Sequence, residues 1–147
     1  MEQASYPFKK YKRELLFEFE SVSETTKVIR KIIAYELIDE QQNVFNLSLV
    51  DKDNEGKISD MVVSNNSDME MVLATVIQTL PVFFAEFEGS KIFFTGSTPS
   101  RTRLYRIIIA KHYKDFEQVY SIFGFINQIP EPFQKNNNYE AFLIFKK

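Results

Sequence analysis

Residues 91–114 read KIFFTGSTPSRTRLYRIIIAKHYK, and this stretch joins a short apolar run, a turn and a longer amphipathic segment. The apolar run at 91–95 predicts a β-strand, and the Gly-Ser-Thr-Pro that follows predicts a tight turn. Thr98 is a typical helix N-cap and Pro99 suits the first helical position, so we expect a helix from there to about His112. The stretch therefore predicts a strand, a turn and a helix in immediate succession.

The residues before this stretch alternate between apolar and polar side chains with the period of two that β-strands have. Leu15, Phe17 and Phe19 are spaced in this way, with glutamates between or beside them. Short polar segments separate the runs, so consecutive strands should pair antiparallel as a meander. The four predicted strands cover residues 14–22, 26–38, 44–50 and 58–63.

After these strands the apolar spacing changes to about 3.6 residues between Met69 and Leu80, which predicts a helix. Ser67 and Glu70 have the spacing of a capping box, so Ser67 is the predicted N-cap. Pro81 lacks a backbone donor, and we therefore expect the helix to stop or kink there. A turn of helix is expected at 115–120.

The C-terminal residues predict two closing strands, at 122–126 and 139–145, on either side of an irregular and exposed connection rich in proline and asparagine. We therefore expect one α+β domain over residues 1–147. In it, a curved, mainly antiparallel sheet packs on two principal helices, in the order four-strand meander, helix, strand, helix and two strands.

Composition excludes several classes of site. The 147 residues are 44% hydrophobic, include fifteen phenylalanines and seven tyrosines, and contain no cysteine and one histidine, His112. Disulfides, thiolate metal sites and histidine clusters are therefore excluded, and we expect no cofactor and no metal. The segment 51–56 resembles the opening of a calcium-binding EF-hand loop, but Val62 stands where the bidentate glutamate is needed. We read it as a polar hairpin turn.

Charge and hydropathy predict a cytoplasmic protein that does not contact a membrane. We expect no apolar run long enough for a signal peptide or for the roughly 18 residues of a membrane span. The net charge of −2 gives no general attraction to nucleic acid, but residues 36–88 hold eleven acids whereas residues 98–114 hold five Lys or Arg and no acid. A polarised surface follows from this distribution.

The arginines at the predicted start of the second helix indicate an anion site, because backbone amides at a helix N-terminus and guanidinium groups both bind anions. Helical spacing places Arg101 on the apolar side, where a desolvated guanidinium needs a negative partner. That partner is either a carboxylate of this chain, with Asp60 and Asp68 as candidates, or an external anion. The predicted anion-binding residues are Gly96, Ser97, Thr98, Ser100, Arg101, Arg103 and Arg106.

Three functional hypotheses follow. The first is a non-enzymatic binding module whose anion site receives a phosphate-bearing ligand, with nucleic acid as a candidate. The second is an enzyme acting on RNA or another phosphate ester, such as a toxin-like ribonuclease, using Asp60 or Asp68 with Arg101. The third is a protein-interaction or dimerisation domain. Because glycine-rich nucleotide loops and a G-x-S-x-G nucleophile elbow are absent, binding is favoured over catalysis and no catalytic residue is assigned.

The segments VSNNSDMEMVLATV (63–76) and FFTGSTPSRTRLYRIII (93–109) resemble those of an uncharacterised family. Its members are single-domain proteins of about 150 residues found mainly in Bacteroidota, and its elements SNN-x-D…VLATV and GST-P-x-RTRLY match here. The resemblance extends over nearly the whole chain. Ser67-Asp68 stands where Gly-Asp is common in the family. The resemblance implies a shared fold and brings no reaction, ligand or partner.

Overall fold

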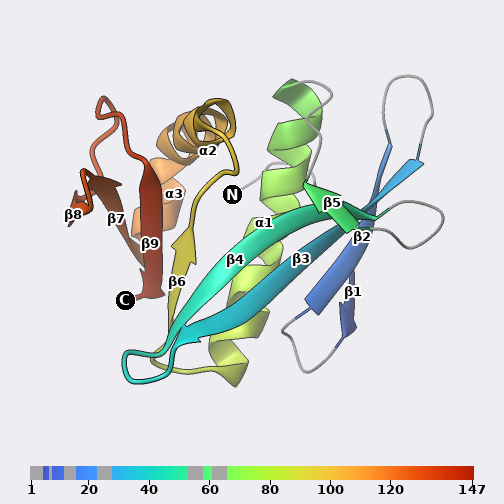
Figure 1. Cartoon of the computed structure of the whole chain (residues 1–147), viewed down its shortest axis with the longest axis horizontal. Helices are drawn as coiled ribbons and strands as arrows, with labels where there is room; N and C mark the ends of the chain where they lie inside the picture. The colour runs from blue at the N-terminus through green and yellow to red at the C-terminus, as the bar shows by residue number, and fades with distance from the viewer. Residues whose placement is uncertain (1–4, 7, 12–15, 23–27, 53–57, 61–65) are drawn as a thin grey trace. The chain divides into compact units, whose positions relative to one another are not determined.

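The computed structural model describes residues 5–6, 8–11, 16–22, 28–52, 58–60 and 66–147 (Figure 1). The described residues form an α+β fold with a mostly antiparallel sheet, which confirms the predicted fold class. The strands are β1 (Phe8–Tyr11), β2 (Leu16–Val22), β3 (Val28–Asp39), β4 (Val44–Lys52), β5 (Ile58–Asp60), β6 (Lys91–Phe94), β7 (Tyr120–Ile126), β8 (Ile129–Pro132) and β9 (Ala141–Lys146). The helices are α1 (Asn66–Glu86), α2 (Pro99–Lys111) and α3 (Tyr113–Glu117).

The described residues divide into two compact units. The N-terminal unit consists of the described residues within 2–36 and 48–88, and the C-terminal unit consists of residues 37–47 and 89–147. The strands β3 and β4 contribute residues to both units. The expectation of a single domain over residues 1–147 stays a prediction.

In the N-terminal unit, the antiparallel strands β2 and β3 provide an aromatic core that α1 covers. The register pairs Phe17 with Ile33, and both side chains are fully buried. Tyr35 lies edge-on to Phe17, with ring centroids 5.9 Å apart, and stacks on Phe83 of α1 at 4.3 Å. The long apolar face of α1 packs on these large side chains, and their burial stabilises the unit because each removes much apolar area from water.

Two buried threonines of α1 satisfy their hydroxyl groups without leaving the core. Thr79 donates to the carbonyl of Val76 at 2.7 Å and lies 2.6 Å from the hydroxyl of Tyr35. A threonine hydroxyl has one hydrogen, so Tyr35 is the donor in the second bond. Thr75 donates to the carbonyl of Met71 and accepts from the backbone N–H of Tyr6.

Of the two outcomes expected at Pro81, a stop of the first helix is wrong, because α1 continues to Glu86, and a kink stays a prediction. A proline inside a helix costs about 3 kcal/mol. Burial of Phe83 and Phe84 beyond it offsets that cost, since each buried aromatic side chain contributes about 1.5–3 kcal/mol. The predicted N-cap, Ser67, falls inside the first turn of α1, and its side chain lies outside the described part of the chain.

The prediction that no segment reaches the length of a membrane span also needs correction. Residues Met69–Glu86 of α1 meet the length and hydropathy of a span, and this is the one helix among the described residues that does so. The match is weak, because core helices of soluble proteins satisfy the same criteria. In this structure 56% of the segment is buried inside the protein, as in a core helix.

In the C-terminal unit the strand order is β4-β6-β9-β7-β8. Strand β6 runs parallel to β4 and antiparallel to β9, so the mainly antiparallel sheet includes a parallel pair. Ile92 and Phe94 of β6 are buried, and the ring of Phe94 stacks on Tyr105 of α2 with centroids 4.6 Å apart. The helix α2 therefore covers the sheet face to which Ile92 and Phe94 belong.

The connection predicted to be irregular contains strand β8, which pairs antiparallel with β7. A two-residue turn joins them, and both of its residues have positive φ, 51° at Asn127 and 67° at Gln128. Such a turn matches the twist of paired strands and so permits a tight hairpin. The prolines at 130 and 132 obscured this strand in the sequence, but prolines are tolerated on an edge strand.

Candidate functional site

The start of α2 is capped as its sequence predicts. Thr98 has an extended backbone conformation, and its Oγ1 accepts a hydrogen bond from the N–H of Arg101 at 3.2 Å. Pro99 occupies the first helical position, where its missing N–H costs nothing. The N-cap assignment is therefore confirmed.

Gly96 holds the turn before α2 tightly against the helix. Its N–H donates to Oγ1 of Thr102 at 3.0 Å, and the same hydroxyl donates to the carbonyl of Thr98 at 3.2 Å. A Cβ at Gly96 would lie 2.6 Å from the backbone nitrogen of Thr102, which no side chain tolerates. The N–H of Gly96 is thus used inside the protein, although the sequence predicts it as a donor to the anion.

The prediction of a buried charge at Arg101 is wrong. The side chain is half-buried, and its Nη1 donates to Oγ of Ser97 at 2.7 Å. Side chains in the first turn of a helix lean back toward its N-terminus, so Arg101 reaches the preceding turn and Thr102 is the buried residue instead. The proposed acidic partners, Asp60 and Asp68, have side chains outside the described residues.

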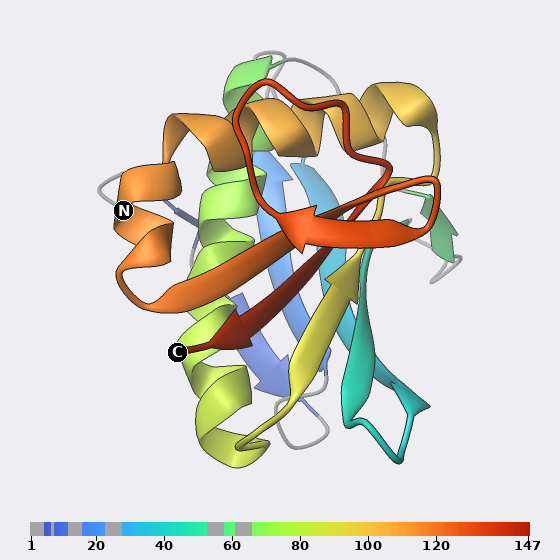
Figure 2. The same ribbon diagram turned by 90° about the vertical axis from the view of Figure 1, so that its left-hand side faces the viewer.

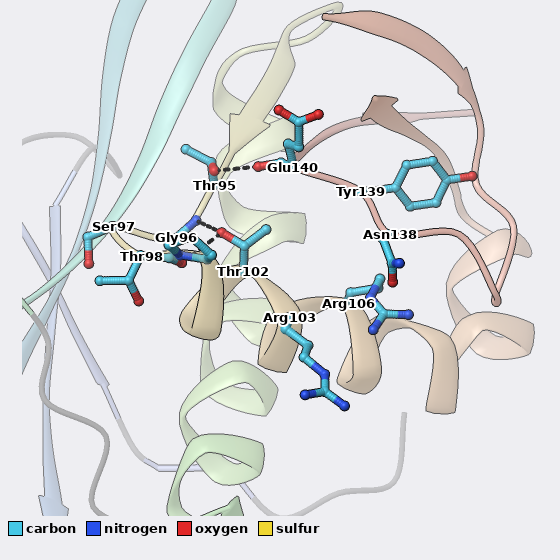
Figure 3. A pocket seen from close by; sticks show the side chains of 11 residues that line it. Thr95, Gly96, Ser97, Thr98, Thr102, Arg103, Arg106, Asn138, Tyr139 and Glu140 are labelled. Carbon is cyan, nitrogen blue, oxygen red and sulfur yellow. Dashed lines mark hydrogen bonds between the residues drawn. The ribbon is translucent and has the colours of Figure 1, made fainter. Parts of the chain in front are cut away.

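An open pocket of about 690 Å³ lies between the start of α2 and the segment that precedes β9 (Figure 3). A hydrogen bond of 2.7 Å from Oγ1 of Thr95 to the carbonyl of Glu140 joins the two sides. The pocket is lined by Thr95, Gly96, Ser97, Thr98, Pro99, Thr102, Arg103, Arg106, Asn138, Tyr139 and Glu140.

The charged groups of this pocket favour an anion. Arg103 is exposed and Arg106 is half-buried, and within the described part of the chain neither guanidinium makes a hydrogen bond or an ion pair. The one carboxylate of the lining, that of Glu140, accepts a hydrogen bond from the N–H of Asn127 at 2.8 Å. In Figure 3 this carboxylate and the Arg106 guanidinium point away from each other. Two unpaired cations beside a helix N-terminus make the pocket electropositive.

Tyr139 forms a buried wall of the pocket. Its hydroxyl donates to Oε1 of Glu131 at 2.8 Å and accepts from the N–H of Gln134 at 2.9 Å. Nδ2 of Asn137 donates to the same Glu131 oxygen at 2.6 Å. Burial, and next the hydrogen bond donated to Glu131, raises the pKa of Tyr139 above its ordinary value. The network fixes the segment that carries Asn138 and Glu140.

Replacing Tyr139 with phenylalanine should lower the free energy of unfolding by about 1–3 kcal/mol, because Glu131 and the N–H of Gln134 lose a partner. The raised pKa means that the neutral phenol is favoured in the folded state. The stability that the Tyr139 hydroxyl contributes is therefore fully present below a pH of about 10, the pKa of tyrosine in the unfolded chain. It is lost as the pH rises through the higher pKa of Tyr139 in the folded state. Urea unfolding at neutral and alkaline pH should show the two proteins converging at high pH. A difference that stays constant would contradict this account.

Of the predicted anion-binding residues, the pocket brings together Gly96, Ser97, Thr98, Arg103 and Arg106. Ser100 and Arg101 do not line it. Sequence reasoning missed six lining residues, which come from the turn before α2, from its first turn or from later in the chain. These are Thr95, Pro99, Thr102, Asn138, Tyr139 and Glu140.

No cluster of three metal-ligating side chains occurs among residues that the structure describes. Asp51, the first residue of the calcium-like loop, is buried and its Oδ1 forms an ion pair with Nζ of Lys31 at 2.9 Å. Residues 53–56 of that loop lie outside the described residues. The position of Asp51 supports a structural role.

The model of one protein family, the Family of unknown function (DUF6934), matches residues 2–147. The chain therefore belongs to this family, and the predicted membership of an uncharacterised family over nearly the whole chain is confirmed. No curated protein matches the chain, and no solved structure matches it.

Proposed function

We propose that this protein, which belongs to a family of unknown function, is a non-enzymatic module that binds an anion. The ligand is the phosphate of a nucleic acid, and the protein is cytoplasmic. The observation that carries the proposal is the presence of two guanidinium groups, those of Arg103 and Arg106, in one pocket, with no carboxylate of the described residues bound to either.

The contacts of the pocket assign different roles to its two kinds of donor. Three backbone positions at the start of α2 offer no free donor to a ligand. The N–H groups of Gly96 and Arg101 bond to hydroxyls, and Pro99 has no N–H. Charge recognition therefore rests on Arg103 and Arg106, since charge-assisted bonds from guanidinium to phosphate are stronger than neutral ones. The positive end of the α2 dipole adds a smaller attraction.

The proposal predicts salt-dependent binding that the paired substitution Arg103→Ala and Arg106→Ala weakens. We expect the double variant to bind a labelled oligothymidylate at least about tenfold more weakly at low salt, because two phosphate contacts are lost. The slope of log affinity against log salt should fall by about 1.4. Fluorescence anisotropy measured between roughly 50 and 200 mM salt gives both quantities.

A matched control removes the same charge elsewhere in the C-terminal unit. Lys114 and Lys146 are exposed and do not line the pocket. The variant Lys114→Ala with Lys146→Ala should bind within about twofold of the unmodified protein, since its lost charges are screened from the pocket by solvent and salt. If this control loses as much affinity as the arginine variant, or if the unmodified protein does not bind at all, the proposal is wrong.

The described residues give the two other hypotheses less support. A phosphate-ester enzyme would use Asp60 or Asp68, whose side chains lie outside those residues, with Arg101, which bonds to Ser97. The edge strand β8 carries Pro130 and Pro132, which cannot donate to a strand of another chain. The binding module is therefore the hypothesis that the geometry supports best.

A further inference from the structure

The sheet of the C-terminal unit has an aromatic face on the side opposite α2. Side chains alternate along each strand, and Phe94, which stacks on Tyr105 of α2, marks the face that the helix covers. In Figure 2, β6 and β9 are seen from a side on which neither α2 nor α3 crosses them. The register of β6, β9 and β7 assigns to the opposite face Phe93, Phe123, Phe125, Leu143 and Phe145, all half-buried.

The rings of this aromatic face lie in two adjoining pairs. The centroids of Phe93 and Phe125 are 5.9 Å apart, with the planes at 65°. Phe123 and Phe145 stack at 5.8 Å, and Nζ of Lys91 lies 5.9 Å from the centroid of the Phe145 ring. The pairs adjoin because Phe123 and Phe125 are two residues apart on β7. Rings that keep part of their surface in water can stack on further flat groups.

A second pocket, of about 280 Å³, opens on the first of these pairs. Its lining consists of Phe93, Phe125, Gln128, Glu140 and Ala141. Glu140 also lines the electropositive pocket, so the two hollows share a wall. Thr95, which follows Phe93 by two residues, lines the electropositive pocket as well. A ligand with a flat ring in one hollow can therefore place an attached anion in the other.

We propose that the aromatic face binds the bases of a single-stranded nucleic acid, with one base in the pocket of Phe93 and Phe125 and its phosphate beside Arg103 and Arg106. This inference rests on the proposed function and adds the identity of the ligand. Base stacking on aromatic side chains in combination with a cationic groove is the means by which single strands are recognised. A duplex does not expose the faces of its bases in this way.

The polar groups of the second pocket fit a base edge. One oxygen of the Glu140 carboxylate accepts from Asn127, and a carboxylate has lone pairs for further donors such as the ring N–H of thymine or the amino group of another base. The amide of Gln128 offers both donor and acceptor. Lys91, beside Phe145, is placed to attract a phosphate next to the second ring pair. A strand of a few nucleotides therefore finds both stacking and charge across this unit.

The test compares an oligothymidylate with an abasic oligomer of the same length, which keeps the phosphates and lacks the bases. The unmodified protein should bind the oligothymidylate roughly fivefold to a hundredfold more tightly, which is the range for one stacked base. Phe125→Leu should remove most of this preference without changing affinity for the abasic oligomer. Phe125→Tyr, which retains a ring, should keep the preference.

Tyr113→Leu serves as the control for loss of a ring, because Tyr113 lies on α3 and stacks on Phe133 rather than on the aromatic face. It should leave both affinities unchanged, and circular dichroism should confirm that all variants are folded. Equal binding of both oligomers by the unmodified protein would overturn the base-stacking inference while leaving the anion site intact. Binding of neither oligomer would overturn the proposed function and the inference together.

Discussion

Replacing Asp51 with alanine is expected to lower the free energy of unfolding by roughly 3–5 kcal/mol, which is the cost of removing one partner of a buried ion pair. Asp51 accepts from Nζ of Lys31 at 2.9 Å, and the side chains of Asp51 and Lys31 are 10% and 2% exposed. The Lys31 side chain would lose this carboxylate in a site from which water is nearly excluded. Urea unfolding followed by circular dichroism measures the change.

The matched control replaces both charges at once. Lys31→Met with Asp51→Leu removes the pair and keeps apolar volume at both positions, and such exchanges are often neutral or stabilising. We expect the double variant to unfold at a urea concentration much closer to that of the unmodified protein than Asp51→Ala does. If the double variant is as unstable as the single one, the loss comes from packing or from other contacts of these residues, and the ion-pair explanation fails.

Gly124→Ala is expected to lower the free energy of unfolding by roughly 3 kcal/mol, at the upper end of the overpacking range. A Cβ at Gly124 would lie 2.2–2.5 Å from three ring atoms of Tyr139, which is far inside van der Waals contact. The ring would have to move, and its hydrogen bond to Glu131 would be lost with it. Urea unfolding measures this change, and the near-ultraviolet dichroism of tyrosine should report the altered packing.

Gly89→Ala provides the comparison, because Gly89 has a φ of 79° and no atom within 4 Å of its added Cβ. That substitution strains the backbone alone and should cost about 1 kcal/mol. The clash explanation also predicts that Gly124→Ala costs little in a Tyr139→Ala background, since the ring is then absent. The clash explanation is wrong if Gly124→Ala lowers the free energy of unfolding as much in the Tyr139→Ala protein as in the unmodified one. It is also wrong if Gly124→Ala has an effect no larger than that of Gly89→Ala.

Structural features that depend on residues close together in the chain were predictable. The alternation of Phe17 and Phe19 predicted β2, and Thr98 followed by Pro99 predicted the start of α2, because strand period and helix capping depend on neighbours in the chain. The sequence rules for proline failed where tertiary packing was more important than local preference. α1 continues past Pro81 because the phenylalanines beyond it are buried, and β8 forms despite two prolines because it is an edge strand.

Part of the candidate site was predictable for the same reason. Arg103 and Arg106 are three residues apart on a helix whose start the sequence marks, so their common location follows from helical geometry. The contact of Arg101 was not predictable, since a long flexible side chain near a helix start has several partners within reach. Its bond to Ser97 depends on how the preceding turn folds over the helix.

By itself, the amino-acid sequence determined the α+β class, the positions of most strands and helices, and the cluster of arginines at the start of α2. Each of these depends on interactions between residues close together in the chain. Only the tertiary structure decided what faces those arginines. The antiparallel pairing of β6 with β9 brings Asn138, Tyr139 and Glu140 to the turn at Thr95, and the Thr95–Glu140 hydrogen bond joins residues 45 positions apart. Contacts over such separations arise from sheet pairing and core packing, which leave no local pattern in the sequence.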